Sequence, residues 1–225
     1  MKYKEIIAEL DKWVLSCGTG KYLPNGIFED FDIRYSLNEN IGMQQNKKEI
    51  SELIKVILKQ KNFKNCLEIG FGYYGSTHFL WRLLFKQAIT IELYRDRIFT
   101  FRDNMNKFYN KFVFDDLKSK FIFGSSNDVA SVNRLIKILD GEKLDFLFID
   151  GNHEYENVVC DWLIYRSFVR KGGIIAFHDC VPHKTYIGPS KLISNIEYFD
   201  GRFKNKIKIH KFIHSSYGIA YYLNP

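Results

Sequence analysis

The run Leu144–Asp150, LDFLFID, constrains the fold of this chain more than any other stretch. Nearly all of its residues are apolar, whereas a strand with one face in water alternates apolar and polar side chains. Continuous apolarity is typical of a strand that is buried on both faces. The run therefore predicts the centre of a parallel sheet that helices cover on both sides.

Strand-like and helix-like segments alternate around this run, and parallel strands need crossovers that helices usually provide. Near the end, the segments 206–213 and 217–223 can pair as a hairpin. The pattern predicts the α/β class: a Rossmann-like, doubly wound, mostly parallel seven-stranded sheet with a C-terminal antiparallel hairpin. The strands expected before the hairpin are Cys66–Ile69, Ala88–Leu93, Lys120–Phe123, Leu144–Asp150 and Ile174–Asp179.

Apolar residues recur at helical spacing between the strands. One helix is expected over Arg95–Phe112, one ends near Leu139, and a short one covers Gly188–Phe199. The helix after the LDFLFID run is expected to end at Lys171-Gly172-Gly173. The expected inward faces are Val129, Val132, Leu135, Ile136 and Leu139; then Val158, Trp162, Tyr165 and Val169; then Leu192, Ile193, Ile196 and Phe199.

The N-terminal quarter differs from this alternating pattern. A helical stripe in residues 1–16, which includes Leu10 and Trp13, precedes a loop-rich stretch, 17–45, and an amphipathic helix, 46–60. We predict that residues 1–60 form a small helical cap segment and residues 61–225 the main domain, in a single globular unit.

The stretch Asn65–Thr77, NCLEIGFGYYGST, reads as strand, tight glycine turn and helix. Glycine allows positive φ and close approach of a ligand to the backbone. A helix start offers N–H groups without helical partners. Such a turn often holds a nucleotide-like ligand at the carboxyl edge of a parallel sheet, although a glycine-rich turn alone is a weak signal.

Charge and cysteine content narrow the cellular setting. The net charge is +7, and Gly201–Pro225 carries five lysines and arginines without an acid. Such a patch can attract nucleic acid or other anions, but a solvated, lysine-guarded strand is the preferred interpretation. The four cysteines are scattered without metal-site spacing, which favours a reducing compartment. We find neither a signal peptide nor a long apolar span, so we expect a cytoplasmic protein without a membrane span.

Four segments carry a family resemblance: LEIGFGYYGST, ITIEL, LDFLFIDGNHEYENVVCDW and RKGGIIAFHD. In this order and spacing they resemble class I S-adenosylmethionine-dependent methyltransferases. More narrowly, they resemble the metal-dependent branch with macrolide-sugar O-methyltransferases and cephalosporin-hydroxylase-like proteins, and more distantly catechol O-methyltransferase. One departure is Tyr74, where related turns often have a small residue.

The resemblance implies S-adenosylmethionine as cofactor and assigns residues to it. Glu68 would orient the methionine amino group, Gly70 and Gly72 would let the cofactor approach, and Ser76 would bind its carboxylate at the helix start. Glu92 would accept hydrogen bonds from the ribose hydroxyls. The remaining candidates are Ser126 and Asn127 at the adenine, with helix N-capping as their alternative role, Asp150 beside the cofactor, and Gln44 and Gln45 at its border.

The reacting centre is expected where two neighbouring strands end. There Asp150, His178 and Asp179 can share a divalent metal, Mg²⁺ or Mn²⁺. In one alternative His178 points away and water completes the shell; in another, the acids cap helices without metal. In the resembled sugar enzymes a histidine at the place of His153 is the general base, and its alternative role is to start the following helix. Asp161 and the histidines His78, His183, His210 and His214 are expected to be structural or at the surface.

These observations favour an O-methyltransferase that acts on a hydroxyl of a small polyhydroxylated acceptor, such as a sugar in a glycan. A nucleic-acid methyltransferase is disfavoured because the chain has Asp150-Gly151-Asn152-His153 where amino-directed enzymes carry an Asn/Asp-Pro-Pro-aromatic motif, so no nucleic-acid partner is expected. A nicotinamide dehydrogenase is disfavoured by the late glycine turn. A non-catalytic cofactor-binding protein stays open. Resembled sugar enzymes are often oligomers, so a homo-oligomer that uses the N-terminal cap is also open.

Overall fold

The computed structural model describes residues 1–17, 42–72, 74–99, 118–182, 187–203 and 207–225, and all statements below concern these residues. Most of the 17–45 loop segment, the 100–112 part of the expected helix Arg95–Phe112, and His183 lie outside them. Residues 95–99 are helical, as expected. No helix in the described ranges is long and apolar enough to cross a membrane.

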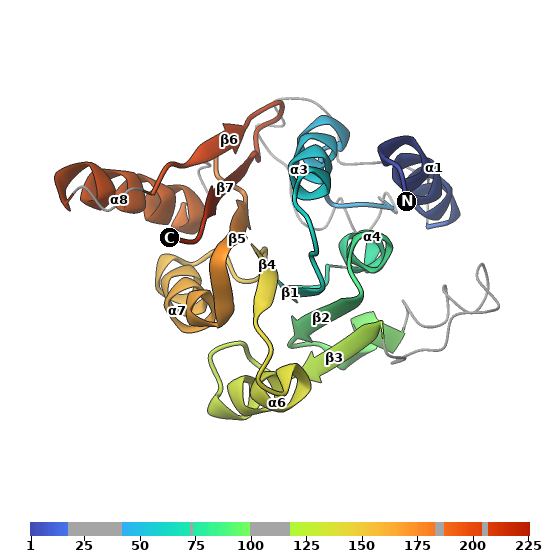
Figure 1. Cartoon of the computed structure of the whole chain (residues 1–225), viewed down its shortest axis with the longest axis horizontal. Helices are drawn as coiled ribbons and strands as arrows, with labels where there is room; N and C mark the ends of the chain where they lie inside the picture. The colour runs from blue at the N-terminus through green and yellow to red at the C-terminus, as the bar shows by residue number, and fades with distance from the viewer. Residues whose placement is uncertain (18–41, 73, 100–117, 183–186, 204–206) are drawn as a thin grey trace.

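A seven-stranded sheet in the order β3-β2-β1-β4-β5-β7-β6 forms the centre of the molecule (Figure 1). Strands β1 to β5 pair in parallel, and β7 runs antiparallel to both β5 and β6. The predicted fold class is therefore confirmed. The strands are β1 Asn65–Ile69, β2 Gln87–Glu92, β3 Ser119–Phe123, β4 Leu144–Ile149, β5 Val169–His178, β6 His210–Phe212 and β7 Ile219–Leu223.

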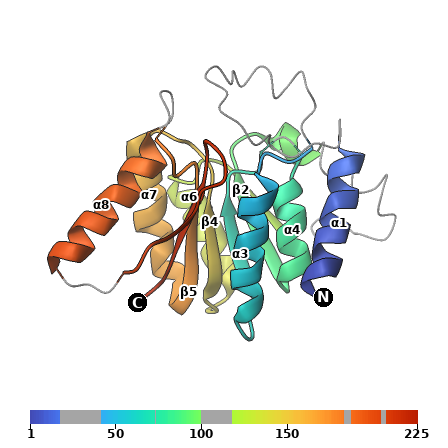
Figure 2. The same ribbon diagram turned by 90° about the horizontal axis from the view of Figure 1, so that it is seen from above.

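Helices cover both faces of this sheet (Figures 1 and 2). One face carries α1 Tyr3–Ser16, α3 Lys47–Lys59 and α4 Ser76–Leu84, and the other carries α6 Val129–Leu139, α7 Tyr155–Tyr165 and α8 Gly188–Phe203. The chain leaves β1 towards β2 and β3 on one side and returns to β4 on the other side of β1. Ligands of open α/β sheets bind at such a switch point, beyond the carboxyl ends of the strands.

Strand β4 is buried along its whole length, as its composition predicts. Phe146 and Phe148 pack into the core under α1, α3 and α4, whereas Leu147 and Ile149 pack into the core under α6, α7 and α8. The one acid in the strand, Asp145, accepts hydrogen bonds from the backbone at the start of β1 and from Arg170. The strand is thus the shared wall of two cores.

The boundary between α7 and β5 differs from the prediction. Helix α7 ends at Tyr165, a 3₁₀ turn covers Arg166–Phe168, and Val169 already belongs to β5. The expected end of the helix, Lys171-Gly172-Gly173, lies inside the strand, where the register shifts and Gly172 has φ 72°. Val169 pairs with Leu144 in the sheet. Its four-residue spacing from Tyr165 therefore led to its wrong assignment to the inward face of the helix.

Several expected element details are also wrong. Val129 and Ile136 are exposed because α6 buries the stripe Ser131, Leu135 and Leu139 instead. The residue that caps α6 is Asp128 rather than Ser126 or Asn127. Helix α8 runs on to Phe203 and leaves Phe199 exposed, and β6 is shorter than expected.

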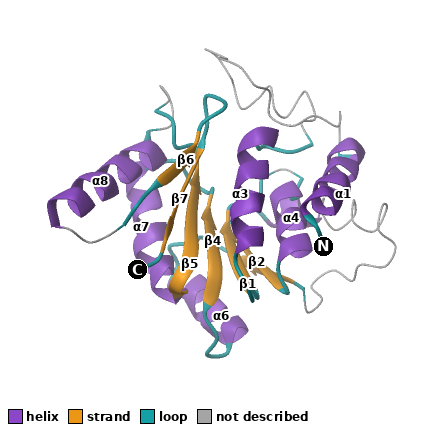
Figure 3. Ribbon diagram, turned by 45° about the horizontal axis from the view of Figure 1, so that its top comes forward, coloured by secondary structure: helices purple, strands orange, loops and turns teal. Residues whose placement is uncertain are grey.

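The turn between β6 and β7 lies beside α3 (Figure 3). Glu49 of α3 is fully buried, and its Oε1 accepts hydrogen bonds from the His214 backbone N–H at 2.7 Å and the Ser215 hydroxyl at 2.9 Å. The His214 Nε2 lies 2.8 Å from Glu52 Oε2. His214 therefore has a partner that the sequence did not indicate, and this partner holds the turn against α3.

Candidate active site

A cavity of about 400 Å³ opens at the carboxyl ends of the parallel strands. This size is within the usual range of small-molecule sites. Its lining comes from the glycine turn after β1, Glu92 at the end of β2, residues 124–127 after β3, residues 150–153 after β4 and residues 178–179 after β5. Gln44, Asn157 and Tyr217 are among the residues that line it from outside the parallel strands. One cavity thus contains most of the predicted site.

The glycine turn adopts the conformation that its sequence predicts. Gly70, Gly72 and Gly75 have φ values of 89°, 67° and 62°. A Cβ atom on Gly70 would lie 2.1 Å from the Asp150 carbonyl oxygen, and one on Gly72 would lie 2.6 Å from Gln44 Oε1. The turn therefore packs against the end of β4 so closely that a side chain at Gly70 would meet backbone atoms.

The first turn of α4 follows this glycine turn. The Ser76 hydroxyl accepts a hydrogen bond from Trp13 Nε1 at 3.0 Å and donates one to the Gly42 carbonyl oxygen. Its hydroxyl is thus committed to α1 and to the segment before α3. The backbone N–H groups of Ser76 and Thr77 lie in the first helical turn, where no helical carbonyl can accept from them.

Glu68 is absent from the described residues that line the cavity, and its expected role at the methionine amino group stays a prediction. It is buried, and its oxygens accept hydrogen bonds from Trp81 Nε1 at 3.1 Å and the Thr90 hydroxyl at 2.9 Å. Burial raises the pKa of Glu68 well above its usual value, and the charges of Asp150 and Glu92 add to this, although the two hydrogen bonds oppose it.

A directional chain of hydrogen bonds ends on Glu68. Because the Thr90 hydroxyl donates to Glu68, His78 Nδ1 must be the donor to Thr90, at 2.7 Å. In the neutral imidazole Nε2 then accepts from the Ser119 hydroxyl at 2.9 Å, and Ser119 accepts from Arg82. His78 is fully buried, so the expectation of a structural histidine is confirmed.

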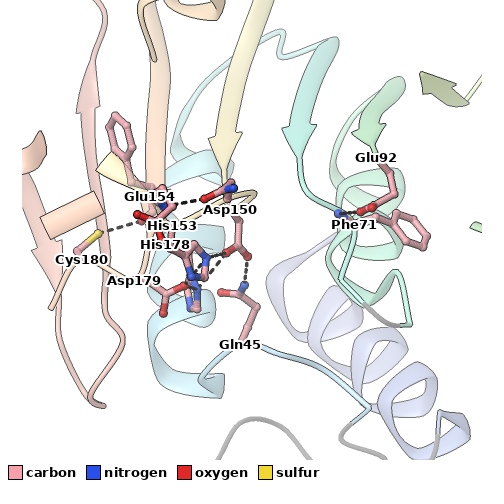
Figure 4. Close-up of polar contacts among 11 residues, drawn as sticks. Gln45, Phe71, Glu92, Asp150, His153, Glu154, His178, Asp179 and Cys180 are labelled. Atoms are coloured by element: carbon pink, nitrogen blue, oxygen red, sulfur yellow. Dashed lines mark hydrogen bonds and ion pairs between the residues drawn. The ribbon is translucent and has the colours of Figure 1, made fainter. Parts of the chain in front are cut away.

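Glu92 lies at the end of β2 with its carboxylate in the cavity lining. Its Oε2 accepts from the Phe71 backbone N–H at 2.9 Å (Figure 4). Its Oε1 accepts from the Tyr94 backbone N–H at 2.8 Å. Arg97 Nη1 lies 3.6 Å from Oε1. These contacts fix an acid beside the glycine turn, where dinucleotide folds place a ribose-binding carboxylate.

Four titratable side chains converge at the carboxyl ends of β4 and β5 (Figure 4). His153 Nε2 lies 3.1 Å from Asp179 Oδ2 and 3.8 Å from Asp150 Oδ1. His178 Nδ1 lies 3.0 Å from Asp179 Oδ2 and 3.3 Å from Asp150 Oδ1. Gln45 Nε2 donates to Asp150 Oδ2 at 2.8 Å. Two carboxylates thus face two imidazoles in a largely buried space.

The charges in this cluster reinforce one another. Burial alone would raise the pKa of Asp150, but the positive charges of the neighbouring His178 and His153 lower it to about 2. Burial disfavours the charged form of each histidine, yet the carboxylates outweigh this and raise the pKa of His153 and of His178. The cluster is therefore arranged to hold positive charge between Asp150 and Asp179.

The side chains that can together hold a metal ion are Asp150, His153 and Asp179, whose ligand atoms all lie within 4.8 Å of one another. Two carboxylates and an imidazole fit a divalent cation such as Mn²⁺ or Mg²⁺. The sequence had named His178 as the third ligand; its Nδ1 faces both carboxylates, while its buried Nε2 has no hydrogen-bond partner in the described chain. Asp179 has φ 55°, a left-handed conformation that aspartate tolerates better than most residues.

Tyr217 is a site residue that sequence reasoning missed. Its ring lies parallel to that of His178, with an interplanar angle of 9° and centroids 6.2 Å apart, and it lines the cavity. It reaches the site because Val181 N–H donates to the Tyr217 carbonyl oxygen at 2.8 Å. Nothing in the local pattern indicates this role, because it depends on long-range pairing of the hairpin.

A glycine turn at the switch point of a doubly wound sheet, with carboxylates at the neighbouring strand ends, defines an α/β protein that binds a nucleotide-like cofactor beside a reacting centre. Residues 67–180, about half of the chain, match the family model described as a methyltransferase domain. The chain belongs to this family.

Comparison with solved structures confirms the fold of S-adenosylmethionine-dependent O-methyltransferases. A putative caffeoyl-CoA O-methyltransferase from Staphylococcus aureus superposes with a TM-score of 0.57 at 13% identity, covering 99% of each chain. MycE methyltransferase from the mycinamycin biosynthetic pathway, in complex with Mg, S-adenosylhomocysteine and mycinamycin VI, gives 0.55 at 18% identity over 96% of this chain and 54% of its own.

One curated relative is similar over a short segment. An uncharacterized protein of Acanthamoeba polyphaga mimivirus is 50% identical over 36 residues, which is 16% of this chain and 16% of that protein. This match supports a local relationship and does not indicate an activity.

Proposed function

We propose that this protein is an S-adenosylmethionine-dependent O-methyltransferase that uses a divalent metal and acts on a hydroxyl of a small polyhydroxylated acceptor, such as a sugar. The observation that carries the proposal is the convergence of Asp150, His153 and Asp179 in the same cavity as the glycine turn. The likeness to MycE, which was solved with Mg and mycinamycin VI, supports the metal and the kind of acceptor.

The cofactor would lie along the β1, β2 and β3 ends of the cavity. Gly70 and Gly72 would let its methionine part approach, and the first N–H groups of α4 at Ser76 would bind the carboxylate. Glu92 would accept hydrogen bonds from the ribose hydroxyls, and Ser126 and Asn127 would face the adenine. The sulfonium would then lie beside Asp150, at the end of β4, which is a parallel neighbour of β1.

Asp150 and Asp179 would hold the metal. A bound divalent cation supplies positive charge that makes the acceptor hydroxyl more acidic. His153 would take the hydroxyl proton as general base, and Asp179, whose Oδ2 lies 3.1 Å from His153 Nε2, would orient the imidazole and stabilise its protonated form. Gln45 would keep Asp150 in place through the bond to its Oδ2. Holding the acceptor oxygen in line with the methyl group would supply much of the remaining acceleration.

One His153 nitrogen cannot bind the metal and accept the proton at the same time. The two roles therefore predict different effects of the His153→Asn substitution. As general base, His153→Asn lowers kcat while metal affinity changes little. If His153 is instead the third metal ligand, the same substitution weakens metal binding and activity together. The His178 ligand, the homo-oligomer, the cytoplasmic location and the cap and domain boundaries remain predictions from the sequence.

The experiment that tests the proposal is calorimetric titration of chelator-stripped protein with S-adenosylmethionine and then with Mg²⁺ or Mn²⁺, repeated for Asp179→Ala. We expect cofactor binding in both proteins and a metal signal that Asp179→Ala abolishes. Cofactor binding without a metal signal would leave a methyltransferase that relies on His153 alone. Absence of cofactor binding would refute the proposal.

A further inference from the structure

One face of α7 carries three polar residues at four-residue intervals: Asn157, Asp161 and Tyr165. Residues four apart lie one above another along a helix. A helix packed on a sheet normally turns apolar residues inward, yet Asp161 is 1% exposed and Tyr165 is fully buried. These three residues, called here the polar stripe of α7, need an explanation that core packing does not supply.

All three members contact the same loop, residues 125–127, which lines the cavity after β3. Asn157 Oδ1 accepts from Asn127 Nδ2 at 3.0 Å. Asp161 forms a hydrogen bond with the Ser126 side chain. The Tyr165 hydroxyl donates to the Ser126 carbonyl oxygen at 2.5 Å. The loop is thus bound at three heights along one helix.

The stripe is costly to the fold. Asp161 Oδ1 is buried without a hydrogen-bond partner among the described residues, and burial raises the pKa of this carboxyl to about 6. Burying a carboxylate with incomplete hydrogen bonding opposes folding. Because Asp161 destabilises the fold and contacts a loop of the cavity, we explain its presence by a role in positioning that loop.

We propose that the polar stripe of α7 positions the adenine-binding loop of the cofactor site, and that Asn157 itself contacts the adenine. The inference rests on the proposed cofactor, S-adenosylmethionine. Asn157 lines the cavity beside Asn127. Each amide keeps one further polar atom, the Nδ2 donor of Asn157 and the Oδ1 acceptor of Asn127. This pair complements the amino edge of adenine, which has an acceptor nitrogen beside an amino donor.

The test is calorimetric binding of S-adenosylhomocysteine and of its inosine analogue, in which an oxygen replaces the adenine amino group. We expect the unmodified protein to prefer S-adenosylhomocysteine. Asn157→Ala and Tyr165→Phe should weaken its binding about threefold to tenfold, the range of one lost hydrogen bond, and should reduce the preference over the inosine analogue.

Tyr222→Phe is the matched control, because the Tyr222 hydroxyl is also buried and accepts from Trp162 Nε1 at 2.7 Å, but it does not contact the loop. Its loss should lower the melting temperature as Tyr165→Phe does, while the affinity for S-adenosylhomocysteine stays within twofold.

Three results would overturn the inference. One is that both stripe variants bind S-adenosylhomocysteine like the unmodified protein. Another is that Tyr165→Phe and Tyr222→Phe weaken binding equally without changing the preference, which would make the stripe merely structural. If the unmodified protein binds no S-adenosylhomocysteine, the proposed function fails first and the inference falls with it.

Discussion

Replacing Asp161 with asparagine should change how the stability of the protein depends on pH. The pKa of this carboxyl is raised from 3.8 to about 6 in the folded protein, mainly by burial. Between these two values the folded state binds more protons than the unfolded state, so the free energy of unfolding falls as pH rises through this window. At 1.36 kcal/mol per pH unit, the loss approaches about 3 kcal/mol above pH 7.

Asp161→Asn removes this titration and keeps a side chain of similar size. The variant should therefore gain stability relative to the unmodified protein as pH rises, by about 2 kcal/mol between pH 4 and pH 7. Comparing the two proteins at each pH cancels the contribution of every other titrating group that both share.

The assay is urea unfolding of the metal-free protein, followed by circular dichroism at half-unit steps from pH 4 to pH 8. Glu156→Gln is the control, because Glu156 is an exposed acid on the same helix and its substitution also replaces a carboxylate with an amide. A difference for Asp161→Asn that stays constant within about 0.5 kcal/mol across the range would refute the reasoning.

Three further substitutions test the packing around the site. Gly70→Ala should lower the free energy of unfolding by about 3 kcal/mol or more and abolish binding of S-adenosylhomocysteine, because the new Cβ would lie 2.1 Å from a backbone atom. Gly141→Ala has a similar φ of 82° but lies in open space, so it should lower the free energy of unfolding by only about 1 kcal/mol in urea. Equal losses of stability in the two variants would contradict this explanation. Trp13→Phe should lower stability by about 1 kcal/mol and weaken S-adenosylhomocysteine binding in calorimetry, since the hydroxyl of Ser76 loses its donor; unchanged affinity would mean that α1 does not set the start of α4. Glu49→Ala should cost about 2 kcal/mol in urea unfolding with cofactor affinity unchanged, whereas Glu49→Gln should recover most of this loss because an amide oxygen can still accept from the β6–β7 turn.

Features that depend on local physics could be predicted from the sequence. Two-sided burial follows from the composition of β4, and the conformation of Gly70 and Gly72 follows from the need for positive φ. The convergence of Asp150 and Asp179 follows from the rule that parallel strands end at one edge of a sheet.

Features that depend on long-range packing could not be predicted. Successive residues of a strand point to opposite faces, but the sequence does not say which face each helix covers. Glu68 therefore points to Trp81 under α4 rather than into the cavity. Asp161 occupies the polar side of an amphipathic pattern, yet the loop after β3 folds over it. Tyr217 enters the site only once the hairpin has formed.

The bond between Trp13 and Ser76 has a consequence for synthesis on the ribosome. The two residues are 63 positions apart, and Trp13 also stacks on Phe79 of α4 at 4.7 Å between ring centroids. At translation rates of about 5–20 residues per second, the ribosome therefore reaches α4 roughly 3 to 13 s after it has synthesised Trp13. During that time α1 has only α3 to pack against, and its Trp13 side chain gains its α4 partners once the glycine turn has been synthesised.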